Sequence, residues 1–194
     1  LRFHRHRRES LTRHLIWVTI LWFVMPFPKA SAEDLQWPSF LGAGKSFVKE
    51  SSLPITWGAK QNKAWEKELP GHGQSSPIIF GNHIFLTAVS GDMKDVNHVV
   101  KFNLKTGSQE WIFSKPTSNK AKNSVYISRA APTPTVDKDG LYAFFESGDL
   151  LGISFSGKEL WSRCLTDTYG PIQSEFGIAS SPTQHEDKLF VLVD

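Results

Sequence analysis

Four histidines follow residue 32 of this 194-residue chain, and they are its first candidates for metal or acid–base chemistry: His72, His83, His98 and His185. No two of them have the short spacing of a local zinc site, and no cysteine lies near them. His72, in the glycine-rich segment 71–73, is the best single candidate for a residue that faces a channel. Because a lone histidine has no partner to define a role, we interpret it as a solvated loop residue.

Three other patterns resemble catalytic or binding motifs without completing them. Gly152 to Lys158 matches the opening of a phosphate-binding loop, but Glu159 stands where Ser or Thr must hold magnesium, and the stretch joins two expected strands instead of opening a helix. The segment 137–140 offers too few oxygen ligands for a calcium loop, so we expect a hairpin turn there. No Gly-x-Ser-x-Gly elbow supports a nucleophilic role for the serines at positions 75, 76, 180 and 181.

The first 32 residues have the pattern of a secretory signal. A basic stretch up to His14 precedes an apolar run from Leu15 to Phe27, which is shorter than the roughly 20 residues of a spanning helix. Ala30 and Ala32 form a small-x-small cleavage site, so we expect a mature chain from Glu33 in the periplasm or outside the cell. The competing interpretation is an uncleaved membrane anchor; otherwise we expect membrane contact only during export.

The charge and cysteine content restrict the partners of the mature chain. Residues 1–32 hold six basic and one acidic side chain; removing them from totals of 22 and 19 leaves 16 basic and 18 acidic. The basic sequence pI near 9.0 therefore belongs to the signal, and we expect no nucleic-acid partner. Cys164 is the only cysteine, so no internal disulfide forms, and we interpret it as a small buried apolar residue.

The elements that would position these residues are short strands. After a lead-in over residues 33–62, with a short strand over 55–57, a repeated pattern fills 63–194. Expected strands cover the residues 64–69, 75–80, 84–89, 98–102, 111–113, 131–136, 141–145, 150–153, 161–165 and 189–193. The runs 84–89, 141–145 and 189–193 are continuously apolar, as in strands covered on both faces.

The repeat can be checked by counting. Seven residues after Pro77, Pro134 and Pro182 come Ile84, Leu141 and Leu189, each followed by Phe or Tyr. Trp65, Trp111 and Trp161 recur at intervals of 46 and 50 residues. Four short strands in each unit of about 40–50 residues predict an all-β fold, a β-propeller of four-stranded blades.

A turn with a glycine four residues before a tryptophan marks each repeat. The first copy, residues 103–111, contains Asn103, Thr106, Gly107 and Trp111; the second, residues 154–161, contains Gly157 and Trp161. Glycine takes positive φ without steric cost, as a tight hairpin demands. We expect the tryptophans to fill the wedge between adjacent blades.

These residues resemble the tryptophan-docking motif of the PQQ-like, or quinoprotein, propeller repeat family. Asn103 replaces the usual Asp, and Lys101 a small residue. Residues 37–42 are also similar to the Trp-Pro-x-Phe-Arg-Gly segment of secreted planctomycete-type members, with Leu41 in place of Arg. The resemblance implies a ring of seven or eight blades, of which this chain supplies about three, so the remaining blades would be missing.

The resemblance leaves two functions open. The first is an exported, non-catalytic binding or scaffold protein with a protein or glycan partner; no cofactor is predicted for it. The second is an alcohol or sugar dehydrogenase that uses PQQ with calcium, its active site mostly outside this stretch. Arg129 and Lys122 could line a channel, but the pattern transfers no catalytic, cofactor or metal residue. A third hypothesis is polysaccharide binding through exposed Trp37 and Trp57.

Overall fold

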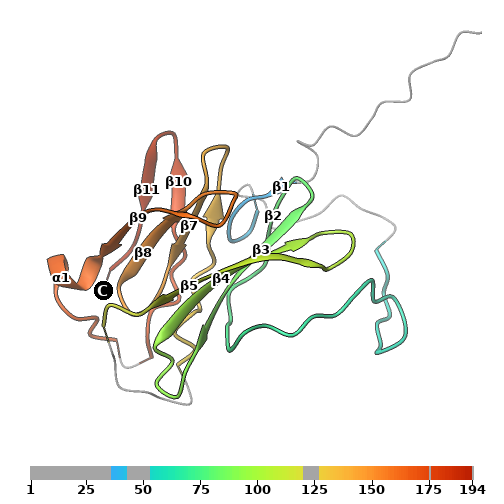
Figure 1. The fold of residues 1–194 in the computed structure, drawn as a ribbon, viewed down its shortest axis with the longest axis horizontal. Helices are drawn as coiled ribbons and strands as arrows, with labels where there is room; N and C mark the ends of the chain where they lie inside the picture. Colours follow the sequence, from blue (N-terminus) through green and yellow to red (C-terminus); the bar gives the residue numbers. More distant parts are fainter. Residues whose placement is uncertain (1–35, 43–52, 120–126, 175, 194) are drawn as a thin grey trace, which may run out of the picture.

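The computed structural model describes residues 36–42, 53–119, 127–174 and 176–193. The predicted signal, with Ala30 and Ala32, lies outside the described residues, as does Lys122. What is described consists of eleven strands and one short helix, arranged in antiparallel sheets that follow one another along the chain (Figure 1). The predicted all-β, repeat-built architecture is confirmed.

The first sheet has five strands in chain order. Its last three strands have eight residues each, and the third and fourth pair along their whole length, from His83 opposite Asn103 to Ser90 opposite Val96. A short N-terminal strand extends the inner side of the sheet. The strands are β1 (Gln36–Trp37), β2 (Ile78–Phe80), β3 (His83–Ser90), β4 (Val96–Asn103) and β5 (Gln109–Pro116).

The second sheet repeats the plan with four strands, and a two-stranded unit follows it. All three connections within the second sheet join antiparallel neighbouring strands. The strands are β6 (Thr135–Val136), β7 (Leu141–Phe144), β8 (Asp149–Ile153) and β9 (Glu159–Cys164), then β10 (Thr183–His185) and β11 (Lys188–Phe190). These units are two blades and the first half of a third.

The main core lies between the first two sheets. Apolar side chains from both sheets meet there, and they are fully or almost fully buried: Ile78, Phe85, Val99, Leu141, Leu151 and Ile153 among others. A strand covered on both faces needs apolar residues at every position, which explains the unbroken apolar runs. The segment 36–42 also joins the sheets, because the Pro38 carbonyl accepts hydrogen bonds from Val136 N–H and the Thr135 hydroxyl.

Several boundary predictions are wrong. Residues 64–69 form no strand; Trp65 is half-buried by a contact with a distant turn, while 66–68 are exposed. Residues 55–57 form no strand either. The strand that carries Trp111 closes the first sheet instead of opening the second, because its ladder runs with β4. The predicted strand 189–193 shrinks to Lys188–Phe190, and Phe190 is 53% exposed.

A single helical turn, α1 (Leu165–Tyr169), was not predicted. It begins directly after β9 and lies on Gly148, where an added Cβ would come 2.6 Å from Thr166 Cγ2. The Gly148 carbonyl accepts the Leu165 N–H at 2.8 Å, and the Thr166 carbonyl accepts that of Gly170. Within the described residues, no helix has the length and apolar character to cross a bilayer.

Candidate functional site: the seam between repeats

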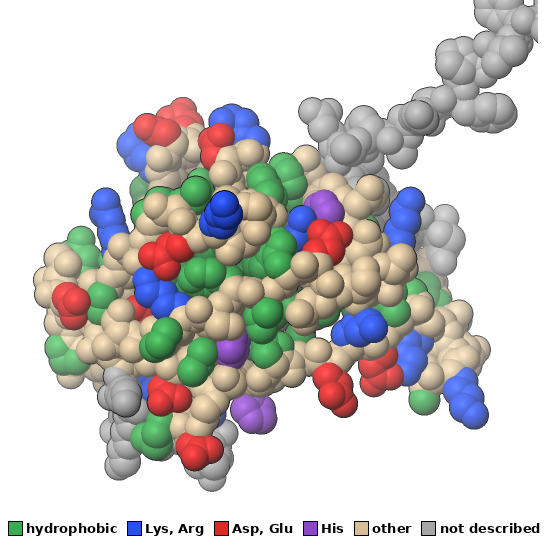
Figure 2. All heavy atoms as spheres, viewed as in Figure 1, with side chains coloured by type: hydrophobic (Ala, Val, Ile, Leu, Met, Phe, Trp, Pro, Cys, Tyr) green, Lys and Arg blue, Asp and Glu red, His purple; other side chains and the backbone are tan. Residues whose placement is uncertain are grey.

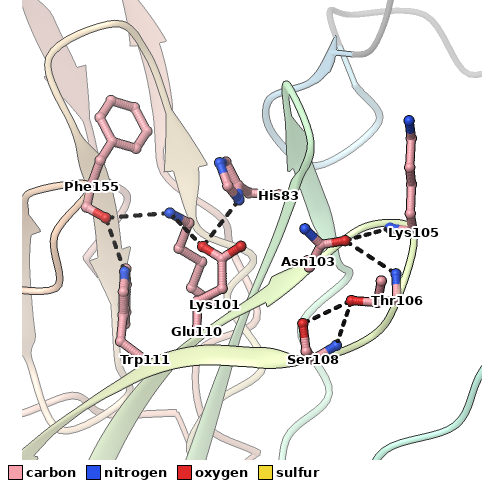
Figure 3. A network of polar contacts seen from close by, with 9 residues as sticks. All are labelled: His83, Lys101, Asn103, Lys105, Thr106, Ser108, Glu110, Trp111 and Phe155. Carbon is pink, nitrogen blue, oxygen red and sulfur yellow. Dashed lines mark hydrogen bonds and ion pairs between the residues drawn. The ribbon is translucent and has the colours of Figure 1, made fainter.

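The turn of the first repeat is held by its own polar side chains. Asn103 Oδ1 accepts the backbone N–H groups of Lys105 at 3.0 Å and Thr106 at 3.1 Å (Figure 3). The Thr106 hydroxyl accepts the Ser108 N–H at 3.2 Å and bonds the Ser108 hydroxyl. Gly107 takes φ +65. An amide oxygen serves this turn as the usual carboxylate would, since only an acceptor is needed.

Trp65 covers that turn from outside the sheet. Its indole N–H donates to the Leu104 carbonyl at 2.9 Å. The ring lies on Gly107, where an added Cβ would come 2.5 Å from Trp65 Cδ2. Glycine is therefore required twice at this position, by the positive φ and by the close approach of the ring.

Trp111 makes the same contact with the turn of the second sheet. Its indole N–H donates to the Phe155 carbonyl at 2.9 Å (Figure 3). Gly157 has φ +82, and a Cβ there would lie 2.9 Å from Trp111 Cδ2. Phe155 reaches back and stacks on Phe80 of the first sheet at 5.3 Å. Each of these tryptophans thus packs on the glycine turn of the following repeat, not on the turn that precedes it in its own repeat.

Trp161, the third tryptophan of the series, has no such turn among the described residues. It lies across Gly152 of its own sheet, where a Cβ would meet Trp161 Cε2 at 2.4 Å, and it stacks on Tyr142 at 6.0 Å. The residue is 36% exposed. The wedge-filling role predicted for Trp161 stays a prediction.

An ion pair lies beside Trp111 at the contact between the first and second sheets, which we call the seam. Lys101 is almost buried, and its ammonium contacts Glu110 Oε2 at 2.9 Å and the Phe155 carbonyl at 3.5 Å. His83 Nδ1 lies 3.3 Å from the same carboxylate oxygen. Figure 3 shows the lysine pointing from β4 toward the Phe155 carbonyl. The hydrogen bond from Lys101 keeps the pKa of Glu110 below its usual range. Lys101 therefore joins two repeats.

A second kind of contact between consecutive repeats is a hydrogen bond from a backbone N–H of one repeat to a hydroxyl of the next. The sequence did not predict it. The Ser76 N–H donates to the Thr133 hydroxyl at 2.9 Å, and the Thr133 N–H donates to the Ser181 hydroxyl at 2.9 Å. Each of these residues directly precedes a repeat proline, 77, 134 or 182. The sequence shows a Ser or Thr before each repeat proline, but only the structure shows that the hydroxyl accepts a hydrogen bond from the neighbouring repeat.

Buried charges gather where the two sheets and the third unit meet. Arg129 is 3% exposed and has φ +65, an unfavourable conformation for a residue with a Cβ. Burial lowers the pKa of its guanidinium, and the carboxylates of Glu146, Asp149 and Asp95 oppose that shift. Arg129 is thus a cation whose charge is compensated from both sheets.

Glu146 is the acid at this junction with the most perturbed protonation. Its Oε1 accepts the Arg129 N–H at 3.1 Å, and its Oε2 lies against Gly177 of the third unit, where a Cβ would be 2.1 Å away. Burial raises the pKa of Glu146 to about 7, against the opposing effect of the backbone N–H groups of Arg129, Ala131 and Ile178. The carboxyl changes charge near neutral pH.

Asp149 is saturated with donors. Its Oδ2 accepts the Ser147 hydroxyl at 2.6 Å, the Asn97 amide at 2.9 Å and the Ser118 N–H at 3.0 Å. Because Asn97 and Ser118 come from the first repeat's side of the seam, Asp149 joins the two sheets at their loop ends. A cavity of about 320 Å³ opens beside this cluster, lined by Asn119, Arg129, Glu146, Ser147, Thr166 and Ile172.

The histidines and the cysteine do not form one site in the described residues. His98 lies between the hydroxyls of Ser90 and Ser114 at 2.7 and 2.8 Å, and burial lowers its pKa. His72 is exposed and pairs its backbone with Val89 next to an open cavity of about 520 Å³. His185 lies on β10.

Cys164 and the two tryptophans proposed for glycan binding also lie apart. Cys164 is half-buried and accepts a hydrogen bond from Asn119 at 3.1 Å. Trp37 is half-buried in β1, where its ring lies on Gly42. Trp57 is exposed in a loop. Of the two, Trp57 is the more exposed, with 70% of the residue accessible.

The described residues do not fit a quinone–calcium site. They contain no group of three or more His, Cys, Asp or Glu side chains close enough to hold a metal ion. Calcium takes six to eight oxygen ligands. At the loop-end cavity, the carboxylates face Arg129 and backbone N–H groups instead, and no reaction step can be assigned to these residues.

Comparison with known proteins identifies the class to which this fold belongs, that of PQQ-like propeller repeats. The family model described as outer membrane protein assembly factor BamB matches residues 21–192. The chain belongs to this PQQ-like repeat family.

The chain is similar to parts of two dehydrogenases, and it spans about a fifth of the length of each. Polyvinylalcohol dehydrogenase from Pseudomonas sp. is 28% identical over 132 residues, which are 66% of this chain and 18% of the relative. A europium-containing methanol dehydrogenase structure covers 65% of this chain and 21% of its own, with 18% identity and a TM-score of 0.45.

Proposed function

We propose that this chain is part of an exported, non-catalytic propeller that binds a protein or glycan partner. The observation that carries the proposal is the use of its polar clusters. Glu110 is paired with Lys101, Asp149 with three donors, and His98 with two serines. A catalytic group needs a reactive atom within reach of a substrate, whereas these groups are engaged in holding strands and repeats together.

The loop-end cavity is the binding position that the geometry favours. It combines hydrogen-bonding groups of Asn119, Ser147 and Thr166 with the apolar Ile172, a mixture that suits reversible recognition. Acidic and basic side chains are interspersed over the face in Figure 2, without a patch of one sign. This distribution supports a partner other than nucleic acid.

Two further features support an exported protein. The basic, then apolar, then small-x-small pattern of residues 1–32 is typical of a secretory signal. The matching family model is described as an outer membrane protein assembly factor, and a chain with an analogous role would be exported.

Reconstitution of the full-length protein with PQQ and calcium tests the proposal. We expect no change in the quinone absorption spectrum and no dye reduction with alcohols or glucose. In parallel, glycan arrays and crosslinking to envelope proteins should recover a partner whose binding weakens when Asn119 is changed to Ala. Turnover of an alcohol by the reconstituted protein would overturn the proposal.

The second candidate is a quinoprotein oxidoreductase, and the match to polyvinylalcohol dehydrogenase favours it. In that case the cofactor and calcium would be held by residues outside the described part of the chain. The same reconstitution separates the two candidates, because only the oxidoreductase reduces the dye.

A further inference from the structure

A tight turn in the lead-in segment holds two large apolar side chains in the open. Phe40 is 52% exposed and Leu41 is 48% exposed. The Gly42 N–H donates to the Ser39 carbonyl at 2.9 Å, and the Ser39 hydroxyl donates back to the Gly42 carbonyl. Trp37 packs on the turn, because a Cβ on Gly42 would lie 2.8 Å from Trp37 Cε3. The exposed position of Phe40 and Leu41 is therefore fixed by the local fold.

The backbone of this turn is strained at Leu41. Its φ is +60, a conformation that a residue with a branched side chain rarely adopts, and the side chain stays half exposed. Strained positions of this kind gather at ligand-binding sites, where the surrounding structure imposes them. Glu186, in the turn between β10 and β11, has φ +52. Both strained residues line the same cavity.

That cavity, which we call the lead-in groove, has a volume of about 1080 Å³. Its walls are three turns: the one after β1, the one between β6 and β7, and the one between β10 and β11. Figure 1 shows all three on the upper side of the molecule. The β7–β8 connection, which carries Glu146, lies at the other end of the second sheet, so the lead-in groove and the loop-end cavity are separate. The lining includes Phe40, Leu41, Asp137, Asp139, Glu186 and Asp187.

The rim of the lead-in groove is acidic. Its described lining has four carboxylates and one lysine, Lys138. Asp137 accepts two backbone N–H groups of its own turn, whereas Asp139, Glu186 and Asp187 are exposed. Asp139 and Asp187 each contact the adjacent lysine of the chain, at 2.7 and 3.1 Å, but all four side chains are at least 65% exposed, so these pairs are weak. Glu186 forms no ion pair within the described residues.

We propose that the lead-in groove binds a short extended peptide in which apolar side chains alternate with lysine or arginine. Alternate side chains of an extended peptide point to opposite faces. The apolar set packs on Phe40 and Leu41, and the cationic set reaches the carboxylates of Asp139, Glu186 and Asp187. The groove is separate from the loop-end cavity, so this inference goes beyond the proposed function, and its failure would leave that function untouched.

The charge of the rim selects this partner over two other occupants of an apolar surface. A symmetric contact between two copies of the chain would place the same acidic rim against itself, and like charges that meet across an interface are costly. An anionic lipid surface would meet the same repulsion. A cationic peptide is complementary to the rim, and its apolar side chains cover the two exposed residues of the turn.

Three fluorescently labelled peptides, added to the 194-residue chain and followed by anisotropy, test the groove. The first alternates lysine with leucine, the second has glutamate in place of each lysine, and the third has serine in place of each leucine. We expect saturable binding of the lysine–leucine peptide. The other two should bind at least about tenfold more weakly, because one loses the charge complementarity and the other the apolar contact.

Variants of the chain locate the binding. Phe40→Ser should weaken binding of the lysine–leucine peptide about tenfold, because it removes half of the apolar surface of the turn. Glu186→Gln should weaken it about two- to fivefold, as expected for one exposed ion pair. Phe176→Ser and Glu68→Gln are the matched controls, since both residues are exposed and lie outside the groove lining, and both variants should bind normally. Circular dichroism shows that each variant retains the fold.

Several outcomes would overturn the proposal. They are no binding of the lysine–leucine peptide, equal affinities for the lysine and glutamate peptides, or Phe40→Ser binding as tightly as Phe176→Ser. Self-association of the chain that Phe40→Ser abolishes would identify a second copy as the occupant and would overturn it too. Binding to vesicles of anionic phospholipid that Phe40→Ser abolishes would do the same in favour of a lipid surface.

Discussion

Trp111 and Trp161 occupy corresponding positions on the last strands of two consecutive sheets, yet their surroundings differ. Trp111 lies between sheets, on Gly157, with its N–H bonded to Phe155 and a lysine–glutamate pair beside it. Trp161 packs on its own sheet, and 36% of the residue is exposed. The comparison shows that Trp111 joins its own sheet to the next one, whereas the contacts described for Trp161 lie within its own sheet.

The largest effect should come from closing the space under Trp111. Gly157→Val places a β-branched side chain at φ +82 and within 3 Å of the indole ring. We expect the free energy of unfolding, measured by urea denaturation, to fall by about 3 kcal/mol or more.

Gly170→Val is the matched control for that substitution. Gly170 has φ +91 with nothing within 4 Å of an added Cβ, so the variant carries backbone strain without the clash. We expect Gly170→Val to lose less unfolding free energy than Gly157→Val. Equal losses would show that the close packing of Trp111 on Gly157 does not contribute to the effect of Gly157→Val.

A pH-dependent effect on stability is expected from Glu146, which lies at the loop ends where the second sheet meets the third unit. Its pKa is about 7 when folded and near 4.5 when unfolded, so the native state holds a proton that the unfolded chain releases. The stability associated with this carboxyl is therefore present below pH 4.5, decreases between pH 4.5 and 7, and is constant above pH 7.

Glu146→Gln should remove this dependence, because the amide does not titrate. Above pH 7 we expect the variant to be more stable than the unaltered protein by up to about 3 kcal/mol, and at pH 4.5 nearly equal to it. Denaturant titrations at four pH values provide the measurement. A variant that is less stable at pH 8 would show that the ionised form of Glu146 is favourable in the fold.

A smaller loss of stability is expected from replacing the tryptophans, and the loss should differ between Trp111 and Trp161. Trp111→Phe removes the donor to the Phe155 carbonyl and part of the buried ring, and should cost about 2 kcal/mol of unfolding free energy. Trp161→Phe removes neither an observed hydrogen bond nor a fully buried ring, and should cost under about 0.5 kcal/mol. Equal losses would contradict the distinction between the closed and the open seam.

An effect smaller than that of Trp111→Phe should come from the turn beneath Trp65. Asn103→Ala leaves the N–H groups of Lys105 and Thr106 without their acceptor, and should cost about 1 kcal/mol because the turn is exposed. Asn103→Asp keeps the acceptor and should be nearly neutral. Thermal unfolding monitored by circular dichroism distinguishes the two.

The sequence predicted the parts of the fold that depend on local pattern. The count from Pro77, Pro134 and Pro182 located the inner strands, and the apolar runs 84–89 and 141–145 identified those covered on both faces. The strand expected over 64–69 did not form because Trp65 and Leu69 pack against the first sheet while residues 66–68 are exposed and pair with no strand. α1 was missed because five residues are too few for a helical period.

The candidate site was less predictable, because its contacts join residues far apart in the chain. Which glycine a tryptophan covers depends on the neighbouring repeat, 39 residues on for Trp65 and Leu104 and 44 for Trp111 and Phe155. The hydroxyl contacts through Thr133 span 57 and 48 residues. Arg129 had been singled out only as a residue that could line a channel; its compensation by carboxylates from both sheets is a property of the assembled seam.

Exchange of the tryptophan indole protons with deuterated water tests the central claim most directly, because it reads each ring in the unaltered protein. The account predicts slow exchange for Trp65 and Trp111, whose N–H groups are bonded across the seam, and fast exchange for Trp161, close to that of exposed Trp57. A Trp161 proton as protected as that of Trp111 would contradict it.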